Sequence, residues 1–167
     1  MFDATRVTNI VIVGLGGQGV ITASDVLAEA AFLAGWDVKK SELPGMSQRG
    51  GSVSSDVRFG PAVYSPMVPE GEADYLIVLA PDQIEPTLRL LRQSGVHITS
   101  IAIDESQLSD RRSLNIGLLG VLSLHVSIAP EHWISAIRTN LPAKLHAVNE
   151  QAFELGRRKR SSPEIHA

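Results

Sequence analysis

Residues 9–19 read Asn-Ile-Val-Ile-Val-Gly-Leu-Gly-Gly-Gln-Gly, and this stretch decides the fold. Its first part, residues 9–13, is a short apolar β-branched run, which is typical of a strand buried on both faces of a parallel sheet. Its second part has the spacing G-x-G-x-x-G, and apolar residues then recur at helical spacing over residues 20–33. A strand, a glycine-rich turn and a helix in this order predict the first unit of a Rossmann-like domain.

The rest of the chain continues this alternation up to about residue 103. Further strands are expected over residues 36–39, 53–59, 74–80 and 96–103, a hairpin partner at residues 62–64, a loop over residues 41–51 and a helix from Pro81. The remainder is helical, with helices expected over residues 116–126, from Pro130, and along a last stripe that Gly156 should end. We therefore expect an α/β protein with a Rossmann-like, doubly wound, mostly parallel sheet and a helical C-terminal segment.

The composition limits both domain count and function. The length of 167 residues suits one domain, which we place at residues 1–156, and we expect a basic, flexible tail over residues 157–167. A net charge of −3 gives no reason to expect nucleic acid as a partner. No apolar run approaches the roughly 20 residues that span a bilayer, so we expect a cytoplasmic protein without a membrane partner. The absence of cysteine excludes disulfides and cysteine-ligated clusters from this chain, and the five histidines lack metal-ligand spacing.

The glycine-rich turn is the first candidate site, and it comprises Gly14, Gly16, Gly17, Gln18 and Gly19. Gly14 permits the tight turn, Gly16 leaves room for a phosphate, and Gly19 lets the helix approach the strand. The free amides of the first helical turn and the helix dipole favour an anion. The alternative is that the glycines only form a compact turn. An NAD site usually has an acid about 20 residues further on, and Glu42 fits that position poorly beside the Lys39-Lys40 pair.

A second glycine-containing loop supplies the other candidate site residues, Ser47, Gln48, Arg49, Gly50 and Gly51. The Arg49 guanidinium suits phosphate or carboxylate, and the glycines free the backbone to approach a ligand. In a doubly wound sheet, this loop should reach the edge that carries the first turn. The alternative is a loop whose Arg49 pairs with a surface acid. No side chain in the sequence stands out as a catalytic acid, base or nucleophile, and no metal site is expected.

Several motifs together carry a family resemblance. In chain order they are Gly14-x-Gly16-Gly17-Gln18-Gly19, Gly45-Met46-x-Gln48-Arg49-Gly50-Gly51-Ser52-Val53, Tyr64-Ser65-Pro66, Gly71-x-Ala73-Asp74, Asn115 with Gly117 and Gly120, and Asn149-x-x-Ala152-Phe153-x-x-Gly156. The set resembles the gamma-type subunit of the pyruvate and 2-oxoacid:ferredoxin oxidoreductases. Its Met-x-Gln-Arg-Gly-Gly form is most similar to the beta subunit of indolepyruvate ferredoxin oxidoreductase. Pro86, inside the helix expected from Pro81, departs from the family pattern.

The resemblance implies a division of labour between subunits. A large catalytic subunit would carry thiamine diphosphate and iron–sulfur clusters. It would oxidatively decarboxylate an aryl or other 2-oxo acid, such as indolepyruvate, to an acyl-CoA. The electrons would pass to ferredoxin or another acceptor. This chain would complete the assembly, be inactive alone, and use its two glycine-rich segments to contact coenzyme A or the partner. Two other functions stay open, namely a free-standing NAD(P)- or flavin-binding domain and a non-catalytic scaffold. Candidates for a subunit contact are Leu118, Leu119, Leu122 and Leu124.

Overall fold

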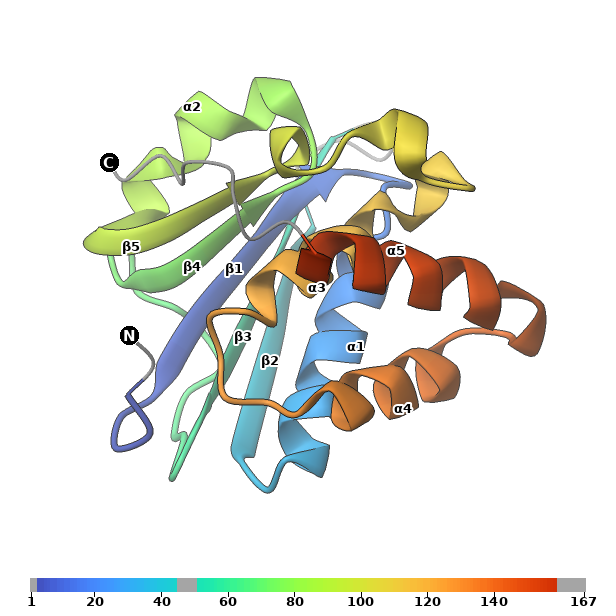
Figure 1. The fold of residues 1–167 in the computed structure, drawn as a ribbon. Coiled ribbons are helices and arrows are strands. Elements are labelled where there is room, and N and C mark those ends of the chain that lie inside the picture. The colour runs from blue at the N-terminus through green and yellow to red at the C-terminus, as the bar shows by residue number, and fades with distance from the viewer. Residues whose placement is uncertain (1–2, 45–50, 159–167) are drawn as a thin grey trace.

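The computed structural model describes residues 3–44 and 51–158. Its five strands form one mixed sheet in the order β2-β3-β1-β4-β5 (Figure 1). The strands are β1 (Thr8–Leu15), β2 (Asp37–Pro44), β3 (Ser52–Gly60), β4 (Ala73–Val78) and β5 (Leu91–Thr99). Strands β1, β4 and β5 pair in parallel, whereas β3 is antiparallel to both β1 and β2. The expected α/β class with a mostly parallel core is confirmed, with β3 as the strand of opposite direction.

The direction of β3 follows from the short connection that precedes it. Only residues 45–51 separate β2 from β3. Two parallel neighbours need a crossover of a dozen or more residues, so a connection of this length joins antiparallel strands instead. The expected loop over residues 41–51 is thus wrong for residues 41–44, which continue β2.

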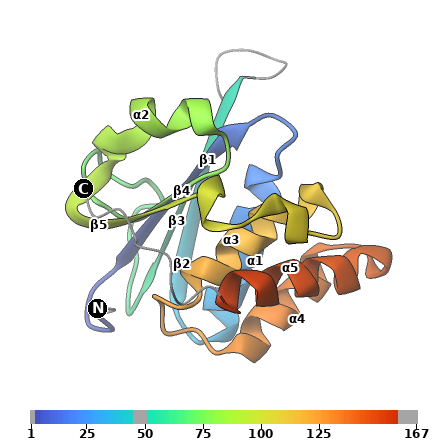
Figure 2. The same ribbon diagram turned by 45° about the horizontal axis from the view of Figure 1, so that its top comes forward.

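Four helices cover one face of the sheet (Figures 1 and 2). Helix α1 (Val20–Leu33) lies against β1, β2 and β3, and α4 (Pro130–Asn140) packs on α1. Helix α3 (Leu114–Leu122) lies beside α1, and α5 (His146–Arg158) packs on α3. The resulting core includes the fully buried side chains of Ile10, Ile12, Leu27, Phe59, Leu118, Trp133 and Phe153. Helix–sheet burial of this extent is the main source of the fold's stability.

The other face of the sheet has thinner cover. A smaller core around Val11, Val13, Leu76 and Val78 lies under the succession η1 (Pro81–Gln83), α2 (Ile84–Thr87) and η2 (Leu88–Leu90). The expected helix from Pro81 is therefore broken into short turns, and β5 begins earlier than expected, at Leu91. Residues 61–72 run across the same face near β2 and β3 and form no strand, so the expected hairpin partner at residues 62–64 is wrong.

Helices α3 and α5 approach closely because glycines line their contact. A Cβ at Gly156 would lie 2.0 Å from the carbonyl oxygen of Gly117, and one at Gly120 would lie 2.1 Å from that of Phe153. Gly156 is inside α5 rather than at its end, so its expected role as a cap is wrong. Of the four leucines expected at a subunit contact, Leu118, Leu119 and Leu122 are fully buried in the core, and Leu124 alone is partly exposed.

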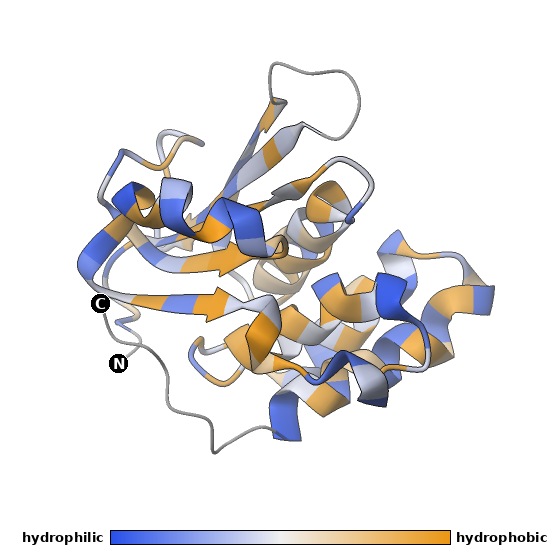
Figure 3. Cartoon of the chain, turned by 90° about the horizontal axis from the view of Figure 1, so that it is seen from above, coloured by the Kyte–Doolittle hydropathy of each residue, from blue (hydrophilic) through white to orange (hydrophobic). Residues whose placement is uncertain are grey.

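Short turns complete the chain: η3 (Ser100–Ala102), η4 (Glu105–Gln107), η5 (Arg111–Ser113) and η6 (Ala143–Leu145). Hydrophobic residues alternate with hydrophilic ones along the covering helices (Figure 3). Strands β1 and β4 are largely apolar, whereas β2 and β3 have a mixed composition. Within residues 3–44 and 51–158, no helix is both long and apolar enough to cross a membrane.

Candidate functional site

The glycine-rich turn lies at the carboxyl end of β1, the central strand of the sheet. The register of β1 with β3 places Leu15 opposite Ser52, so the end of the second loop arrives beside the turn. The amide of Gly16 donates a hydrogen bond to the carbonyl oxygen of Gly51 at 3.0 Å. These two expected site residues therefore meet. Ser47, Gln48, Arg49 and Gly50 lie outside the described residues.

Gln18 fastens the turn from within. The side-chain Oε1 of Gln18 accepts a hydrogen bond from the backbone amide of Leu15 at 2.7 Å. The backbone amide of Gln18 donates to the carbonyl oxygen of Leu15 at 3.1 Å. Gly14 is closely packed beneath them, since a Cβ there would lie 2.9 Å from Val20 Cγ2 and 3.1 Å from Leu79 Cβ. The side-chain oxygen of Gln18 and the amide of Gly16 are thus both engaged in holding the two segments in place.

The open end of the turn carries the chemistry suited to an anion. Gly17 and Gly19 have φ values of +89° and +80°, which favour glycine, and Gly16 and Gly17 are exposed. Gly19 is the N-cap of the 14-residue helix α1, which has no side-chain cap and no acidic residue in its first turn within the described chain. Uncapped first-turn amides and the positive end of the helix dipole attract negative charge. The geometry at α1 therefore suits a phosphate or carboxylate.

A cavity of about 190 Å³ opens beside this turn, and the sequence did not predict its far wall. Its lining comes from the turn and α1, from η5 and the start of α3, and from η6 and α5. The lining residues that the sequence reasoning missed include Thr22, Asp110, Arg112, Ser113, Asn115 and Asn149. Asn115 and Asn149 did appear in the family pattern, but nothing in the sequence linked either of them to the turn.

Asn115 ties the helical C-terminal segment to the turn. Its Nδ2 donates to the carbonyl oxygen of Gly19 at 3.0 Å, and a Cβ at Gly19 would lie only 2.4 Å from that nitrogen. Asn115 is 5% exposed, and its Oδ1 is buried without a hydrogen-bond partner among the described residues. A side chain larger than hydrogen at position 19 would therefore displace Asn115.

Charged side chains near this edge are mostly paired. The hydrogen bonds from the Arg112 side chain and backbone lower the pKa of Asp110, so this carboxylate stays ionised on the rim of the cavity. Burial lowers the pKa of Lys40, but its bonds to Asp25 and Glu42 outweigh burial and raise that pKa. Lys40 thus binds the carboxylate of Glu42. In a Rossmann NAD site, the acid at the corresponding position binds the ribose instead.

The ligands that a metal centre could use are cysteines anywhere in the full sequence and clustered side chains among the described residues. The chain has no cysteine, so thiolates for an iron–sulfur cluster cannot come from it. Within the described ranges, no group of three or more His, Asp or Glu side chains is placed to hold a metal ion.

The Nε2 of His97, on β5 under α2, is buried without a described partner, and burial lowers the pKa of this imidazole.

Residues 9–100 match the family described as pyruvate ferredoxin/flavodoxin oxidoreductase. The indolepyruvate oxidoreductase subunit IorB of Pyrococcus horikoshii is 33% identical over 188 residues, covering 89% of this chain and 93% of that one. The subunit of the same name from Thermococcus kodakarensis is 34% identical with the same coverage.

Solved structures share the fold. The gamma subunit of a keto/oxoacid ferredoxin oxidoreductase from Geobacter sulfurreducens superposes with a TM-score of 0.78 at 21% identity, covering 93% of this chain and 97% of that one. A 2-oxoglutarate:ferredoxin oxidoreductase from Magnetococcus marinus superposes with a TM-score of 0.80 at 18% identity, covering 98% of this chain but 33% of that one. With a family match over more than half of its length and 33% identity to a relative across most of both chains, this chain belongs to the pyruvate ferredoxin/flavodoxin oxidoreductase family.

Proposed function

We propose that this chain is the small subunit of a 2-oxoacid:ferredoxin oxidoreductase and works only in complex with a larger catalytic subunit. The support is its similarity, over 89% of its length, to relatives named as subunits of indolepyruvate oxidoreductase. The reaction we propose is the thiamine diphosphate-dependent oxidative decarboxylation of an aryl or other 2-oxo acid, such as indolepyruvate, to an acyl-CoA. The isolated chain is expected to be inactive.

The redox and decarboxylation chemistry is assigned to the larger subunit. This chain supplies no thiolate, so the iron–sulfur clusters would be ligated by the partner. Thiamine diphosphate would also sit on the partner, and ferredoxin or another acceptor would receive its electrons there. What this chain contributes is the edge of the sheet where its two glycine-rich segments meet.

The observation that supports placing the site at this edge is the hydrogen bond from the amide of Gly16 to the carbonyl oxygen of Gly51, which joins the two segments. Gly16, Gly17, Gln18 and Gly19, with Ser47, Gln48, Arg49, Gly50 and Gly51, are proposed to contact coenzyme A or the partner chain. Gly14, which is buried beneath the turn, is proposed to act by shaping it. The adjoining cavity of about 190 Å³ is smaller than the roughly 300–1,000 Å³ of whole-cofactor sites. It would therefore take one end of a ligand, such as a phosphate or carboxylate at the α1 N-terminus, rather than an entire coenzyme.

The test is co-expression with the native neighbouring genes, followed by analysis of what copurifies. A brown partner that contains thiamine diphosphate and oxidises a 2-oxo acid supports the proposal. Arg49→Ala should lower turnover of that complex without changing the melting temperature of the isolated chain. Arg138→Ala is the control, because Arg138 forms an ion pair with Glu150 between helices α4 and α5, outside both glycine-rich segments. Equal turnover of the Arg49 variant and wild type would remove Arg49 from the site.

The same preparation separates the other functions. Tight NAD(P) or flavin binding by the isolated chain, with no copurifying partner, would indicate a free-standing nucleotide-binding domain. A partner that is fully active without this chain would indicate a non-catalytic scaffold.

A further inference from the structure

Residues 61–72 form a loop whose backbone is bonded to the sheet beneath it. Three side chains of β2 and β3 make these bonds: Asp37 accepts from the amide of Val63 at 2.7 Å, Asp56 accepts from that of Val68 at 2.8 Å, and Arg58 donates to the carbonyl oxygen of Ser65 at 2.8 Å. Pro61, Pro66 and Pro69 further restrict the backbone. The loop is therefore held in one conformation along most of its length.

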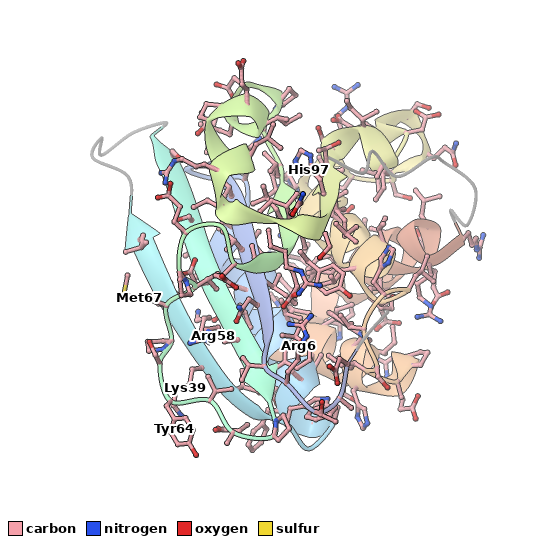
Figure 4. The ribbon with its side chains drawn as sticks, turned by 90° about the vertical axis from the view of Figure 1, so that its left-hand side faces the viewer. Arg6, Lys39, Arg58, Tyr64, Met67 and His97 are labelled. Carbon is pink, nitrogen blue, oxygen red and sulfur yellow. The ribbon has the colours of Figure 1, made fainter. Side chains whose placement is uncertain are left out.

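This fixed loop presents large side chains to solvent. Tyr64 is 94% exposed and Met67 is 52% exposed, and both project from the same side of the molecule with Lys39 and Arg58 between them (Figure 4). Tyrosine and methionine are enriched in protein interfaces. A loop already fixed by its own bonds loses little conformational freedom on binding. Rigid display of these side chains therefore favours docking of a partner.

The loop lies over the part of the sheet that has no helical cover. One face carries α1, α3, α4 and α5, and the other carries α2 with its flanking turns near β4 and β5. Over β2 and β3 on that second face, the described chain provides only residues 61–72. An antiparallel region such as β2–β3 can leave one sheet face without helical cover, and that face is then accessible to a partner. This face is the one that a second polypeptide would complete.

A longer structural neighbour indicates which kind of polypeptide could cover this face. In the Magnetococcus marinus oxidoreductase, 98% of this chain superposes on 33% of a much longer chain. The same fold is therefore one part of a larger polypeptide there. A separate chain of this fold needs a non-covalent contact to join an equivalent assembly.

We propose that residues 61–72 are the surface on which the large subunit of the oxidoreductase docks, with Tyr64 and Met67 each inserted into an apolar depression of that subunit. The partner surface that fits carries polar or acidic groups between the two depressions, because Lys39 and Arg58 lie between the two anchors. This inference rests on the proposed function, since it names the contact through which the small subunit joins its partner.

Tyrosine nitration tests the contact directly, because the chain has two tyrosines in opposite environments. Tyr75 is buried and its hydroxyl donates to the carbonyl oxygen of His125, so tetranitromethane should modify the isolated chain at Tyr64. In the purified complex, peptide mass spectrometry should show Tyr64 nitrated at least about tenfold more slowly, as expected for an anchor excluded from water. Nitration of Tyr64 at the same rate in the complex would overturn the proposal.

Affinity measurements with matched variants provide the second test. Tyr64→Ala and Met67→Ala should each raise the Kd for the large subunit by about tenfold, as interface anchors do. The control is Phe32→Ala, because Phe32 is an aromatic residue 65% exposed at the end of α1 on the opposite face. The Phe32→Ala variant should have a Kd within about twofold of the wild-type value, because most residues other than anchors change the affinity little. The melting temperature of each isolated variant should equal that of wild type.

The outcomes separate the docking surface from the proposed function. If wild-type chain binds no large subunit, the proposed function itself is contradicted. If wild type binds but the Tyr64 and Met67 variants bind equally well, only the docking surface is contradicted. Weakened binding by Phe32→Ala alone would place the interface on the helical face instead.

Discussion

The amide of Gly16 donates to the carbonyl oxygen of Gly51, and this bond joins the glycine-rich turn to the end of the second glycine loop. It extends the pairing of β1 with β3 by one step beyond the register of Leu15 with Ser52. The turn is therefore held on one side by the sheet. On the other side it is held by Asn115, whose Nδ2 donates to the carbonyl oxygen of Gly19. Bonds on both sides pre-organise the first-turn amides of α1, which lowers the entropy lost on binding an anion.

Gly19→Ala should destabilise the protein by more than backbone strain alone. A left-handed conformation costs an alanine about 1–2 kcal/mol, and the new Cβ would also meet Asn115 Nδ2 at 2.4 Å. Displacing Asn115 should add roughly 1–2 kcal/mol, in the range of overpacking in a closely packed site. Urea denaturation of the isolated chain measures the free energy of unfolding.

Gly17→Ala is the matched control for this prediction. Gly17 has a similar φ of +89°, but a Cβ there meets nothing within 4 Å. The Gly17→Ala variant should therefore lose only the free energy of backbone strain, about 1–2 kcal/mol. In an Asn115→Ala background, Gly19→Ala should cost no more than Gly17→Ala does. Equal losses for both glycines in the wild-type background would show that Asn115 does not constrain position 19.

Gly156→Ala should separate α5 from α3. Alanine would gain about 1 kcal/mol in helix propensity over glycine, but its Cβ would lie 2.0 Å from the carbonyl oxygen of Gly117. That atom is backbone and cannot rotate away, so a net loss of about 2–3 kcal/mol is expected from overpacking. Gln151→Ala, at an exposed position of the same helix, should change the free energy of unfolding by less than about 0.5 kcal/mol. Thermal melts that show the Gly156 variant unchanged would contradict the close packing of these helices.

Local pattern predicted most of the strands and helices. The β-branched runs predicted β1 and β4, helical spacing predicted residues 20–33 as α1, and Pro130 correctly marked the start of α4. The errors arose where tertiary contacts override local preference. Residues 41–44 extend β2 because they pair with β3, and residues 62–64 form no strand because their backbone is bonded to side chains of the sheet.

The site was predictable only in part for the same reason. The turn could be placed at the end of β1, and the second loop at the same edge, from strand order and glycine spacing alone. The far wall of the cavity comes from η5, α3 and α5. The spacing of residues in the sequence does not indicate that the segment near residue 115 packs against residue 19. Leu118, Leu119 and Leu122 looked like an apolar contact surface, but α5 covers them together with the sheet.

Asp74→Ala should be strongly destabilising. The Asp74 side chain is 3% exposed, and its carboxylate accepts hydrogen bonds from Arg6 at 2.7 Å and from the backbone amide of Asn9 at 2.8 Å. It also forms an ion pair with Arg92 at 2.9 Å. Its removal leaves two guanidiniums close together, with the half-exposed Asp3, 3.9 Å from Arg6, as the remaining described counter-charge. The loss should be roughly 2–3 kcal/mol, below the ~3–5 kcal/mol for fully buried pairs, because the Arg6 and Arg92 side chains are 38% and 35% exposed.

Glu70→Ala serves as the control for the Asp74 variant. Glu70 pairs with Arg89, but both side chains are mostly exposed. Such a pair contributes less than about 1 kcal/mol, so this variant should unfold within about 0.5 kcal/mol of wild type. A small loss for Asp74→Ala, equal to that for Glu70→Ala, would show that the arginines do not depend on the buried carboxylate.

Asp56→Asn should remove a pH dependence of stability that the native loop anchor creates. Burial raises the pKa of Asp56 above its ordinary value of 3.8, against the lowering effect of the Val68 amide and of Arg58. Between the unfolded and folded pKa values the native state binds more protons than the unfolded state, so stability falls as pH rises through that window. Asparagine can still accept the Val68 bond through its Oδ1 and carries no charge to desolvate. The variant should therefore be at least as stable as wild type at pH 7, without the loss of stability above pH 3.8.

Asp37→Asn should change stability with the opposite sign, at the β2 carboxylate that also binds residues 61–72. The amide of Val63 lowers the pKa of Asp37, with Lys39 adding to that effect, so its stabilising contribution is present above pH 3.8 and is lost as pH falls through the lowered folded pKa. Asparagine at position 37 should therefore reduce stability at pH 7, with a difference that shrinks toward pH 3. Urea denaturation at pH steps from 3 to 7, with hydrogen exchange at the Val63 and Val68 amides, measures both anchors. If both variants shift stability in the same direction at pH 7, the two carboxylates do not hold residues 61–72 in the way that the structure indicates.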